Sequence, residues 1–231
     1  MTIRFLGQSG YILESEDSCI ILDPYLSDSV NRVAGRPRLL PIPIDPQEIV
    51  CDAVICTHNH LDHLDVDTVS QMSDSQFFIT TNEGKKKLQE LGKNNVQALS
   101  WNETVMVGDF EITAVFAAHT VEAFGLIVKA EGKTLYLSGD TLFDERLFEI
   151  AQYRPDVTFI CINGRLGNMN TEEALVVANK IGANINVPNH HDMFASNSAD
   201  PYRFADFIPG GLVIEFNKKY SIADSTLEIA D

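Results

Sequence analysis

The chain has 231 residues, 45% hydrophobic and 22% charged, a composition that argues against a disordered or fibrous protein and suits one domain over residues 1–231. The 17 basic and 33 acidic residues give a formal net charge of −16, which repels phosphate backbones and argues against nucleic-acid binding. The N-terminus lacks a signal-peptide pattern and no apolar run approaches the ~18 residues of a membrane span, so we expect a cytoplasmic protein without membrane association.

The first half of the chain alternates short apolar runs with breaks, which predicts strands. Three strands are expected at the start, over Ile3–Leu6, Tyr11–Glu14 and Cys19–Asp23. The segment from Ser27 to Pro46, with three arginines and four prolines, predicts a loop with little regular structure. A buried strand over Ala53–Cys56 then leads into a histidine-rich run and a short helix from Val66. The next predicted elements are a strand at Gln76–Thr80, a helix at Asn82–Leu91, and strands at Thr104–Val107, Phe110–Phe116, Gly125–Ala130 and Thr134–Leu137.

The second half changes to β-α-β alternation. It predicts a helix at Phe143–Tyr153, a strand at Val157–Ile162, a helix at Glu172–Ile181 and a strand at Asn184–Val187. Asn170 with Glu173 predicts a capping box, and Asp200-Pro201 predicts a helix start. Leu212–Phe216 and Tyr220–Ala223 predict a closing hairpin. Strands and helices in both halves, without an internal repeat or flexible linker, indicate an α/β fold with two packed sheets and helices outside, a four-layer αββα arrangement.

The four cysteines, Cys19, Cys51, Cys56 and Cys161, lack C-x-x-C spacing, and three of them lie within apolar runs. We interpret all four as reduced core residues, because a free cysteine packs like a small hydrophobic side chain. Disulfide or metal-binding roles are the alternative interpretation.

The most informative feature is the run His58-x-His60-x-Asp62-His63, which places three imidazoles and a carboxylate directly after a buried strand. Residues two apart on an extended segment point the same way, so His58 and His60 would face one pocket, while Asp62 and His63 turn toward a second ion. Imidazoles with carboxylates suit zinc, and also manganese or iron. The alternatives are a surface cluster without a ligand role and a single structural ion site.

Other candidate ligands also follow strands. His119 follows an apolar strand, and Asp140 closes Leu135-Tyr-Leu-Ser-Gly-Asp140, whose glycine permits a sharp turn. An aspartate at this place would also suit a helix N-cap. The pair His190-His191 follows another strand. We expect His190 to complete the second metal site and His191, which points the other way, to orient the substrate or leaving group.

The motifs Thr57-His-Asn-His-Leu-Asp-His63, His119, Ser138-Gly-Asp140 and His190 resemble, in this order, those of the metallo-β-lactamase superfamily. More narrowly, Asp23-Pro-Tyr-Leu-Ser-Asp28, Asn163-Gly-Arg-Leu-Gly-Asn-Met-Asn170 and Pro188-Asn-His-His-Asp-Met-Phe194 resemble the L-ascorbate-6-phosphate lactonase group. The resemblance covers nearly the whole chain. Asn189 departs from the aromatic or apolar residue that this group tends to have there.

The resemblance implies a metallo-β-lactamase sandwich with two divalent metal ions, zinc or manganese, in a cleft at one edge. It assigns the first metal to His58, His60 and His119, the second to Asp62, His63 and His190, and the bridge to Asp140. Two such metals would share a water and lower its pKa. Asp62 would then act catalytically by orienting the resulting hydroxide through a hydrogen bond.

Candidate substrate contacts lie on a glycine-rich loop after a strand, a usual place for them: Asn163, Arg165 and Asn168. Arg165 is the candidate anion clamp, because paired guanidinium donors bind carboxylate or phosphate groups. Alternatively, it only solvates a turn or holds a neighbouring acid. Asp23 is either a hydrogen-bond partner of a ligand imidazole or a turn aspartate. We interpret three arginines as solvated loop charges rather than substrate contacts: Arg32, Arg36 and Arg38.

Three functions are compatible with these residues. The leading one is hydrolysis of a lactone or cyclic ester of a sugar-like acid, with or without a phosphate group, by attack of a metal-bridging hydroxide. The alternative is a phosphodiesterase acting on cyclic nucleotides or similar small phosphodiesters, since the same metals serve a phosphorus centre. The non-enzymatic alternative is a metal-dependent binding or sensing protein. We expect a small-molecule anionic substrate as the partner, and the sequence leaves homo-oligomer formation open.

Overall fold

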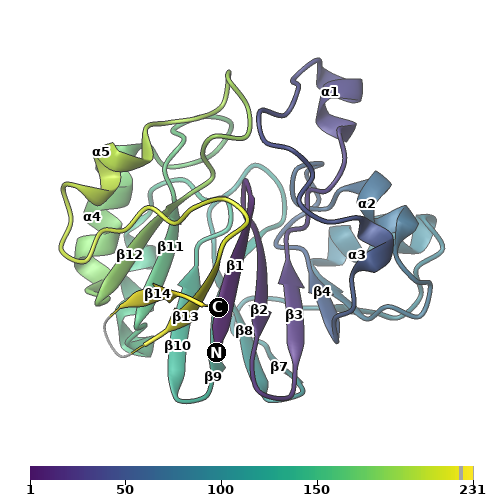
Figure 1. Ribbon diagram of the computed structural model, residues 1–231, viewed down its shortest axis with the longest axis horizontal. Coiled ribbons are helices and arrows are strands. Elements are labelled where there is room, and N and C mark those ends of the chain that lie inside the picture. The colour runs from purple at the N-terminus through teal and green to yellow at the C-terminus, as the bar shows by residue number, and fades with distance from the viewer. Residues whose placement is uncertain (224–225, 231) are drawn as a thin grey trace.

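A computed structural model describes residues 1–223 and 226–230, in which two β-sheets pack face to face (Figure 1). One sheet has the order β14-β13-β1-β2-β3-β4-β5-β6, with β1 Thr2–Gly7, β2 Gly10–Glu14, β3 Cys19–Leu22, β4 Ala53–Ile55, β5 Phe78–Thr80, β6 Val96–Ala98, β13 Lys219–Ile222 and β14 Leu227–Ile229. The other has the order β12-β11-β10-β9-β8-β7, with β7 Thr104–Val107, β8 Phe110–Phe116, β9 Phe124–Ala130, β10 Lys133–Leu137, β11 Val157–Cys161 and β12 Ile185–Asn189.

Helices cover the outer faces of both sheets. The helices are α1 Ser29–Ala34, α2 Val66–Gln71, α3 Asn82–Glu90, α4 Thr171–Ile181 and α5 Pro201–Ala205, with 3₁₀ turns η1 Pro46–Glu48 and η2 Glu145–Tyr153. In Figure 1, α2 and α3 lie on one flank and α4 and α5 on the opposite flank, which confirms the predicted αββα arrangement. Among the described residues, none of the helices combines the length and apolar character that a membrane crossing requires.

Strand directions decide where the loops meet. In the first sheet, β2 is antiparallel to both β1 and β3, and β3 is parallel to β4, so β1, β3 and β4 run the same way. In the second sheet, β9 is antiparallel to both β8 and β10, and β10, β11 and β12 are parallel. The loops after β1, β3, β4, β8, β10, β11 and β12 therefore gather at one edge of the sandwich, the upper edge in Figure 1.

The main core lies between the sheets and holds Tyr11, Phe110, Phe124 and Phe159, each at most 1% exposed. Burying such a side chain contributes roughly 1.5–3 kcal/mol. In β11 the side chains alternate: Phe159 faces this core, whereas Ile160 faces a second core under α4. A parallel strand that is buried on both faces consists of a nearly continuous run of apolar residues, as β11 does.

Two predicted helix starts are confirmed. Asn170 and Glu173 form a capping box at α4, where the Asn170 side chain accepts from the Glu173 N–H and the Glu173 carboxylate accepts from the Asn170 N–H. The carboxylate of Asp200 accepts from the N–H of Tyr202 at the start of α5. Both caps satisfy N–H groups that the first helical turn leaves unpaired.

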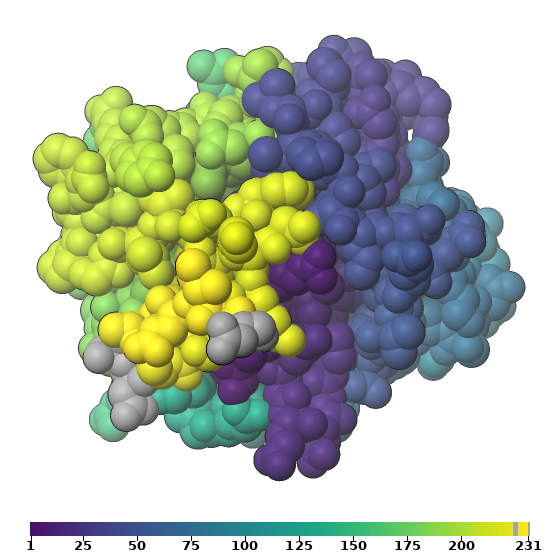
Figure 2. Space-filling view, in the orientation of Figure 1, coloured from purple at the N-terminus to yellow at the C-terminus, as the bar shows by residue number. Residues whose placement is uncertain are grey.

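The C-terminal hairpin prediction is wrong. Residues 212–216 form no strand; the N–H of Leu212 bonds only to the carbonyl of Asn186. The strand β13 instead pairs with β1 and with β14, so this segment closes the first sheet, and Figure 2 shows it lying against the N-terminal strand. The apolar residues of 212–216 thus pack against the core without backbone strand pairing. Alternation of apolar and polar residues alone cannot distinguish such a segment from a strand.

Three smaller differences concern short elements. The segment predicted as a loop over Ser27–Pro46 contains α1, which ends at Gly35 in the left-handed conformation. The helix predicted at Phe143–Tyr153 is built of 3₁₀ turns from Glu145. The short edge strands β6 and β14 are absent from the sequence prediction.

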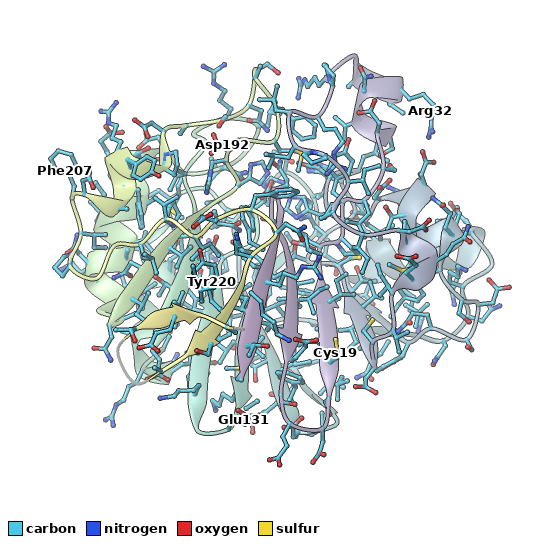
Figure 3. All side chains as sticks on the ribbon, in the orientation of Figure 1. Cys19, Arg32, Glu131, Asp192, Phe207 and Tyr220 are labelled. Carbon is cyan, nitrogen blue, oxygen red and sulfur yellow. The ribbon has the colours of Figure 1, made fainter. Side chains whose placement is uncertain are left out.

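All four cysteines are free, but only two are core residues. Cys56 and Cys161 are buried as predicted, whereas Cys19 and Cys51 are partly exposed. Cys19 and Cys51 line a surface pocket of about 670 Å³, together with Glu131. Figure 3 shows Glu131 at the lower edge, far from Asp192 at the upper edge, so these two thiols lie away from the loops that carry the histidines.

Candidate metal centre

The histidine-rich run turns sharply after β4. The N–H groups of His63 and Leu64 both bond to the carbonyl of His60, which closes the turn. Leu61 packs against the loop cluster of Tyr25, Val30, Met193 and Phe194, while Leu64 is buried in the core under α2. These two leucines anchor the turn and leave the side chains between them facing the centre of the edge.

One group of candidate ligands consists of His58, His60, His119 and Asp140. Nδ1 of His60 lies 3.0 Å from Nε2 of His58 and 3.2 Å from Nε2 of His119. Oδ2 of Asp140 lies 4.0 Å from Nε2 of His58 and 3.9 Å from Nε2 of His119. The structure therefore brings together the three histidines that the resemblance assigned to the first metal and the aspartate that it assigned to the bridge.

The second group consists of Asp62, His63 and His190. Oδ2 of Asp62 lies 3.8 Å from Nε2 of His63 and 3.4 Å from Nε2 of His190. Oδ1 of Asp140 lies 3.2 Å from Nε2 of His63 and 3.3 Å from Nε2 of His190. One oxygen of Asp140 thus faces each group, which is the arrangement that a bridging carboxylate requires.

Asp140 reaches this position through the turn after β10. Gly139 has φ +55°, and a Cβ at Gly139 would lie 3.1 Å from the carbonyl oxygen of Phe124 and 3.2 Å from Cβ of Thr57. The left-handed conformation favours glycine, and the close approach leaves little room for a side chain. Glycine before Asp140 therefore lets the carboxylate enter between the two sheets.

Hydrogen bonds at the far side of the rings fix which nitrogen faces the centre. Nδ1 of His119 donates to the carbonyl of Gly167 at 3.0 Å, and Nδ1 of His63 donates to Oδ2 of Asp23 at 2.7 Å. Nδ1 of His58 lies 3.2 Å from Oγ1 of Thr57, whose own hydrogen goes to Asp23. Each of these rings therefore turns Nε2 toward the centre, as ligand histidines do.

Charge separates the two groups. Burial, with neighbouring imidazoles, lowers the pKa of His58 well below its usual value and also lowers the pKa values of His60 and His119. At His63 and His190 burial opposes the charged form, yet the neighbouring carboxylates raise the pKa of His63 well above its usual value and that of His190 to about 9. The neutral rings of the first group can bind a cation directly, whereas His63 and His190 must each release a proton.

Two orphaned atoms test whether a cation fits. Nε2 of His63 and Oδ1 of Asp140 are buried and have no hydrogen-bond partner, although they lie 3.2 Å apart. Native proteins seldom leave such atoms unpaired, and an ion is one of the groups that satisfies them. An imidazole nitrogen and a carboxylate oxygen that converge at this distance fit a divalent cation, which would displace the imidazole proton, so the residues present fit the predicted metal site.

Comparison with known proteins places this fold and edge in a family. A family profile described as "Beta-lactamase superfamily domain" matches residues 19–191. The chain belongs to the β-lactamase superfamily. The match contains the histidine run, His119, Asp140 and His190, all the side chains of the two candidate groups.

Several members and neighbours are similar over almost the whole chain. A UPF0173 metal-dependent hydrolase of Oenococcus oeni is 26% identical over 239 residues, covering 95% of this chain and 99% of that protein. A metallo hydrolase of Ignicoccus hospitalis has a TM-score of 0.78 at 21% identity, covering 96% of this chain and 99% of the other. An isothiocyanate hydrolase from Delia radicum gut bacteria has a TM-score of 0.81 at 16% identity, covering 96% and 99%. The structural likeness confirms the metallo-β-lactamase fold.

His191 points away from the two groups of candidate metal ligands. Its Nδ1 lies 2.9 Å from Oδ2 of Asp192, and its ring lies 5.8 Å from that of Phe5. His191 and Phe5 line a pocket of about 360 Å³ together with Leu40, Tyr202 and Phe216. Of the adjacent pair, only His190 has its Nε2 within the second group, and the catalytic role predicted for His191 stays a prediction.

The predicted substrate contacts are engaged with protein groups. Nδ2 of Asn168 donates to Oδ1 of Asn163 at 3.0 Å, and Nδ2 of Asn163 donates to Oδ1 of Asn197 at 2.9 Å; Asn163 and Asn168 are buried. Arg165 is exposed and donates to the carbonyl of Ser196. The two asparagines shape the loop that carries Gly167 to His119, and substrate contact by the three residues stays a prediction.

Two of the three arginines of the long loop, Arg32 and Arg38, have structural partners. Arg38 donates to the carbonyls of Tyr25, Ser27, Leu40 and Pro41 and so holds the loop together. Arg32 pairs with Asp67 of α2 and points outward in Figure 3. Arg38 is therefore not a solvated charge, and that interpretation is wrong for it.

Sequence reasoning missed Gln8. This buried residue follows β1, and its Nε2 lies 2.7 Å from Oδ2 of Asp62 and 2.9 Å from Nε2 of His190. The sequence signal that could have indicated it is a large polar side chain in the tight turn Gly7-Gln-Ser-Gly10. This turn follows β1, whose direction places it at the same edge of the sandwich as the candidate ligands.

Proposed function

We propose that this superfamily member is a metal-dependent hydrolase with two divalent cation positions that share Asp140. The observation that carries the proposal is the division of the Asp140 carboxylate, with Oδ1 toward His63 and His190 and Oδ2 toward His58 and His119. The metal-dependent hydrolase of Oenococcus oeni supports it, since that relative matches this chain almost from end to end.

The side chains of the site have different roles in the proposed reaction. When bound, divalent cations lower the pKa of water and offset negative charge on the attacked group. Asp62, at 18% exposure, is more open to solvent than the buried His63 and Asp140. Its carboxylate would hold a cation with one oxygen and accept, with the other, a hydrogen bond that orients the attacking water or hydroxide. His58, His63, Asp140 and His190 are buried, whereas His60 and His119 are partly exposed, so water and substrate would reach the centre from the side of Asp62, His60 and His119.

The substrate class that we propose is a lactone or cyclic ester of a sugar-like acid, with or without phosphate. Arg165 supports an anionic group on the substrate, because this exposed guanidinium lies two residues from Gly167, whose carbonyl holds His119. His191, at the wall of the neighbouring pocket, would orient the substrate or leaving group. A local positive charge beside the cations can attract a small anion despite the net charge of −16.

The test is hydrolysis by protein that has been stripped of metal and reloaded with either zinc or manganese. Proton release in a pH-stat would be followed with a panel of sugar-acid lactones and a panel of cyclic nucleotides, since both reactions release acid. Benzyl isothiocyanate, followed by its absorbance, forms a third arm because one fold neighbour is an isothiocyanate hydrolase. The metal-free protein is the control in every arm.

Metal-dependent turnover confined to the lactones is the expected result. Turnover confined to cyclic nucleotides would replace the lactonase with a phosphodiesterase, and turnover confined to the isothiocyanate would replace it with that activity. Metal binding without turnover in any arm, also on a generic aryl ester, would support a binding or sensing protein instead.

A further inference from the structure

Gln8 occupies an unusual position at the metal edge. It lies in the two-residue turn between β1 and β2 with φ +57°, a left-handed conformation that favours glycine over a large side chain. Its side chain is fully buried, and its carbonyl accepts from the N–H of His190. Backbone strain that is kept at a candidate site points to a role for the side chain held there.

The end of this side chain lies among the ligand atoms of the second group. Nε2 of Gln8 is 2.7 Å from Oδ2 of Asp62 and 2.9 Å from Nε2 of His190. Ligand atoms about 2.0–2.2 Å from a common cation lie roughly 2.9–3.5 Å from each other. The separations among Asp62, His63, His190 and Asp140 run from 3.2 to 3.8 Å, close to that range. The Gln8 amide borders two of these four atoms, so it lies beside the same cation position.

The amide also carries an unused acceptor. Oε1 of Gln8 is buried and has no hydrogen-bond partner, and the terminal oxygen and nitrogen exchange places when the amide turns by 180°. A cation at the second group repels N–H hydrogens and attracts a carbonyl oxygen. We propose that Gln8 is a further ligand of the second cation position, binding through Oε1.

This ligand makes the two positions chemically different. The first has three imidazoles and one carboxylate oxygen, a set of four that suits tetrahedral zinc. The second gains an amide oxygen beside Asp62, His63, His190 and Asp140, five donors that a water extends to six. Octahedral sites rich in oxygen suit manganese. The second position therefore prefers manganese to zinc, and Gln8 sets that preference.

The test is the metal selectivity of the Gln8→Met variant, which keeps the length of the side chain and removes the amide oxygen and the amide NH₂. Equilibrium dialysis gives the affinities of the second position for manganese and zinc, and cobalt absorption reports its coordination number. We expect manganese affinity to fall about 10- to 100-fold, zinc affinity to fall less, and the visible cobalt bands to strengthen as coordination decreases. Gln8→Glu, which keeps an oxygen at this corner, retains the wild-type cobalt spectrum.

Gln89→Met is the matched control, since Gln89 is exposed at the C-terminal end of α3. Equal losses for manganese and zinc with an unchanged cobalt spectrum would overturn the proposal and make Gln8 only a hydrogen-bond donor to Asp62. The inference rests on the proposed metal-dependent function, but the readout is binding rather than turnover. Wild-type protein that binds fewer than two cations would instead contradict the two-cation function itself.

Discussion

Nδ1 of His63 lies 2.7 Å from Oδ2 of Asp23, so one buried carboxylate orients a ligand imidazole from behind. Asp23 also accepts from the N–H and from Oγ1 of Thr57, both at 2.7 Å. Three donors therefore fix the carboxylate, and the carboxylate holds the proton of His63 on Nδ1, so that Nε2 is the nitrogen that would bind a cation. Of the two sequence interpretations of Asp23, the structure supports the hydrogen-bond partner of a candidate ligand imidazole.

We expect Asp23→Asn to weaken metal binding at the second position about 10- to 100-fold. The asparagine oxygen can keep the bond from Thr57, but its NH₂ group then faces the N–H of His63. That clash drives the proton of His63 to Nε2, the atom that faces the cation position. Chelator competition gives the affinity, and elemental analysis gives the metal content.

The matched control is Asp17→Asn, because Asp17 is exposed at the opposite edge beside Glu16. Its metal affinity should equal that of the wild type. Unchanged affinity in Asp23→Asn as well would mean that the carboxylate does not set the tautomer of His63.

Asp62→Asn tests the orienting role that we propose. The variant keeps the shape of the side chain and the neighbours at Gln8 and His190, but it loses the negative charge that binds a cation and accepts a strong hydrogen bond from the attacking water or hydroxide. We expect turnover on the substrate found in the hydrolysis panel to fall about 10²- to 10⁴-fold, while at least one metal stays bound. Turnover and bound metal are measured on the same sample, and undiminished turnover would exclude the role.

Metal removal should lower the thermal stability of the protein. The buried Nε2 of His63 and Oδ1 of Asp140 then lack a partner, and ligand present at about 1,000 times its Kd contributes about 4 kcal/mol. For a chain of this size the corresponding fall in Tm is about 8–16 °C. Calorimetry with a chelator, followed by reloading, measures it, and an identical Tm in both states would contradict a metal site at this edge.

The site was more predictable than its surroundings, for a physical reason. Parallel strands present their C-terminal ends at one edge, so His58, His119, Asp140 and His190 could each be placed there from the strand before it. The orientation of the His119 ring, by contrast, depends on a hydrogen bond to the carbonyl of Gly167, 48 positions away in the sequence. No local sequence pattern predicts that contact.

Gln8 and the segment 212–216 show the limits of local pattern. Gln8 is a single polar residue in a two-residue turn, and only the long-range pairing of β1 with its neighbours brings it to Asp62. Leu212 and Ile214 read as strand residues because they are apolar and alternate. They pack against the core cluster between the sheets without forming a ladder, since β13 already occupies the free edge of β1.

The partly exposed cysteines should react slowly at neutral pH. Burial, together with the charges of Glu14 and Asp52, raises the pKa of Cys19 to about 11; burial, with Cys19 and Asp52, raises that of Cys51 to about 12. Only the thiolate reacts, so at pH 8 roughly one thiol in 10³ to 10⁴ is reactive. Alkylation rates measured by peptide mass spectrometry should rise about tenfold for each pH unit up to pH 11, with free glutathione as the reference. Rapid labelling at pH 8 would contradict the raised pKa values.

The loop that carries His119 is tied to the start of α3 by Glu122. One oxygen of Glu122 accepts from Nδ2 of Asn82 at 2.9 Å and the other from the N–H of Glu83 at 2.8 Å. A carboxylate at a helix N-terminus pairs free N–H groups and complements the helix dipole. We expect Glu122→Ala to lower the free energy of unfolding by about 1 kcal/mol, measured by urea unfolding.

The same variant separates stability from metal positioning when metal-loaded and metal-free proteins are compared. If Glu122 only stabilises α3, both forms lose the same free energy of unfolding. If it also holds His119 in place, the loaded form loses more, because a looser loop weakens binding at the first position and part of the metal's stabilisation is lost. We expect the larger loss in the loaded form. Glu90→Ala is the control: at the C-terminal end of α3 a carboxylate opposes the dipole, so its removal leaves stability unchanged or slightly raised.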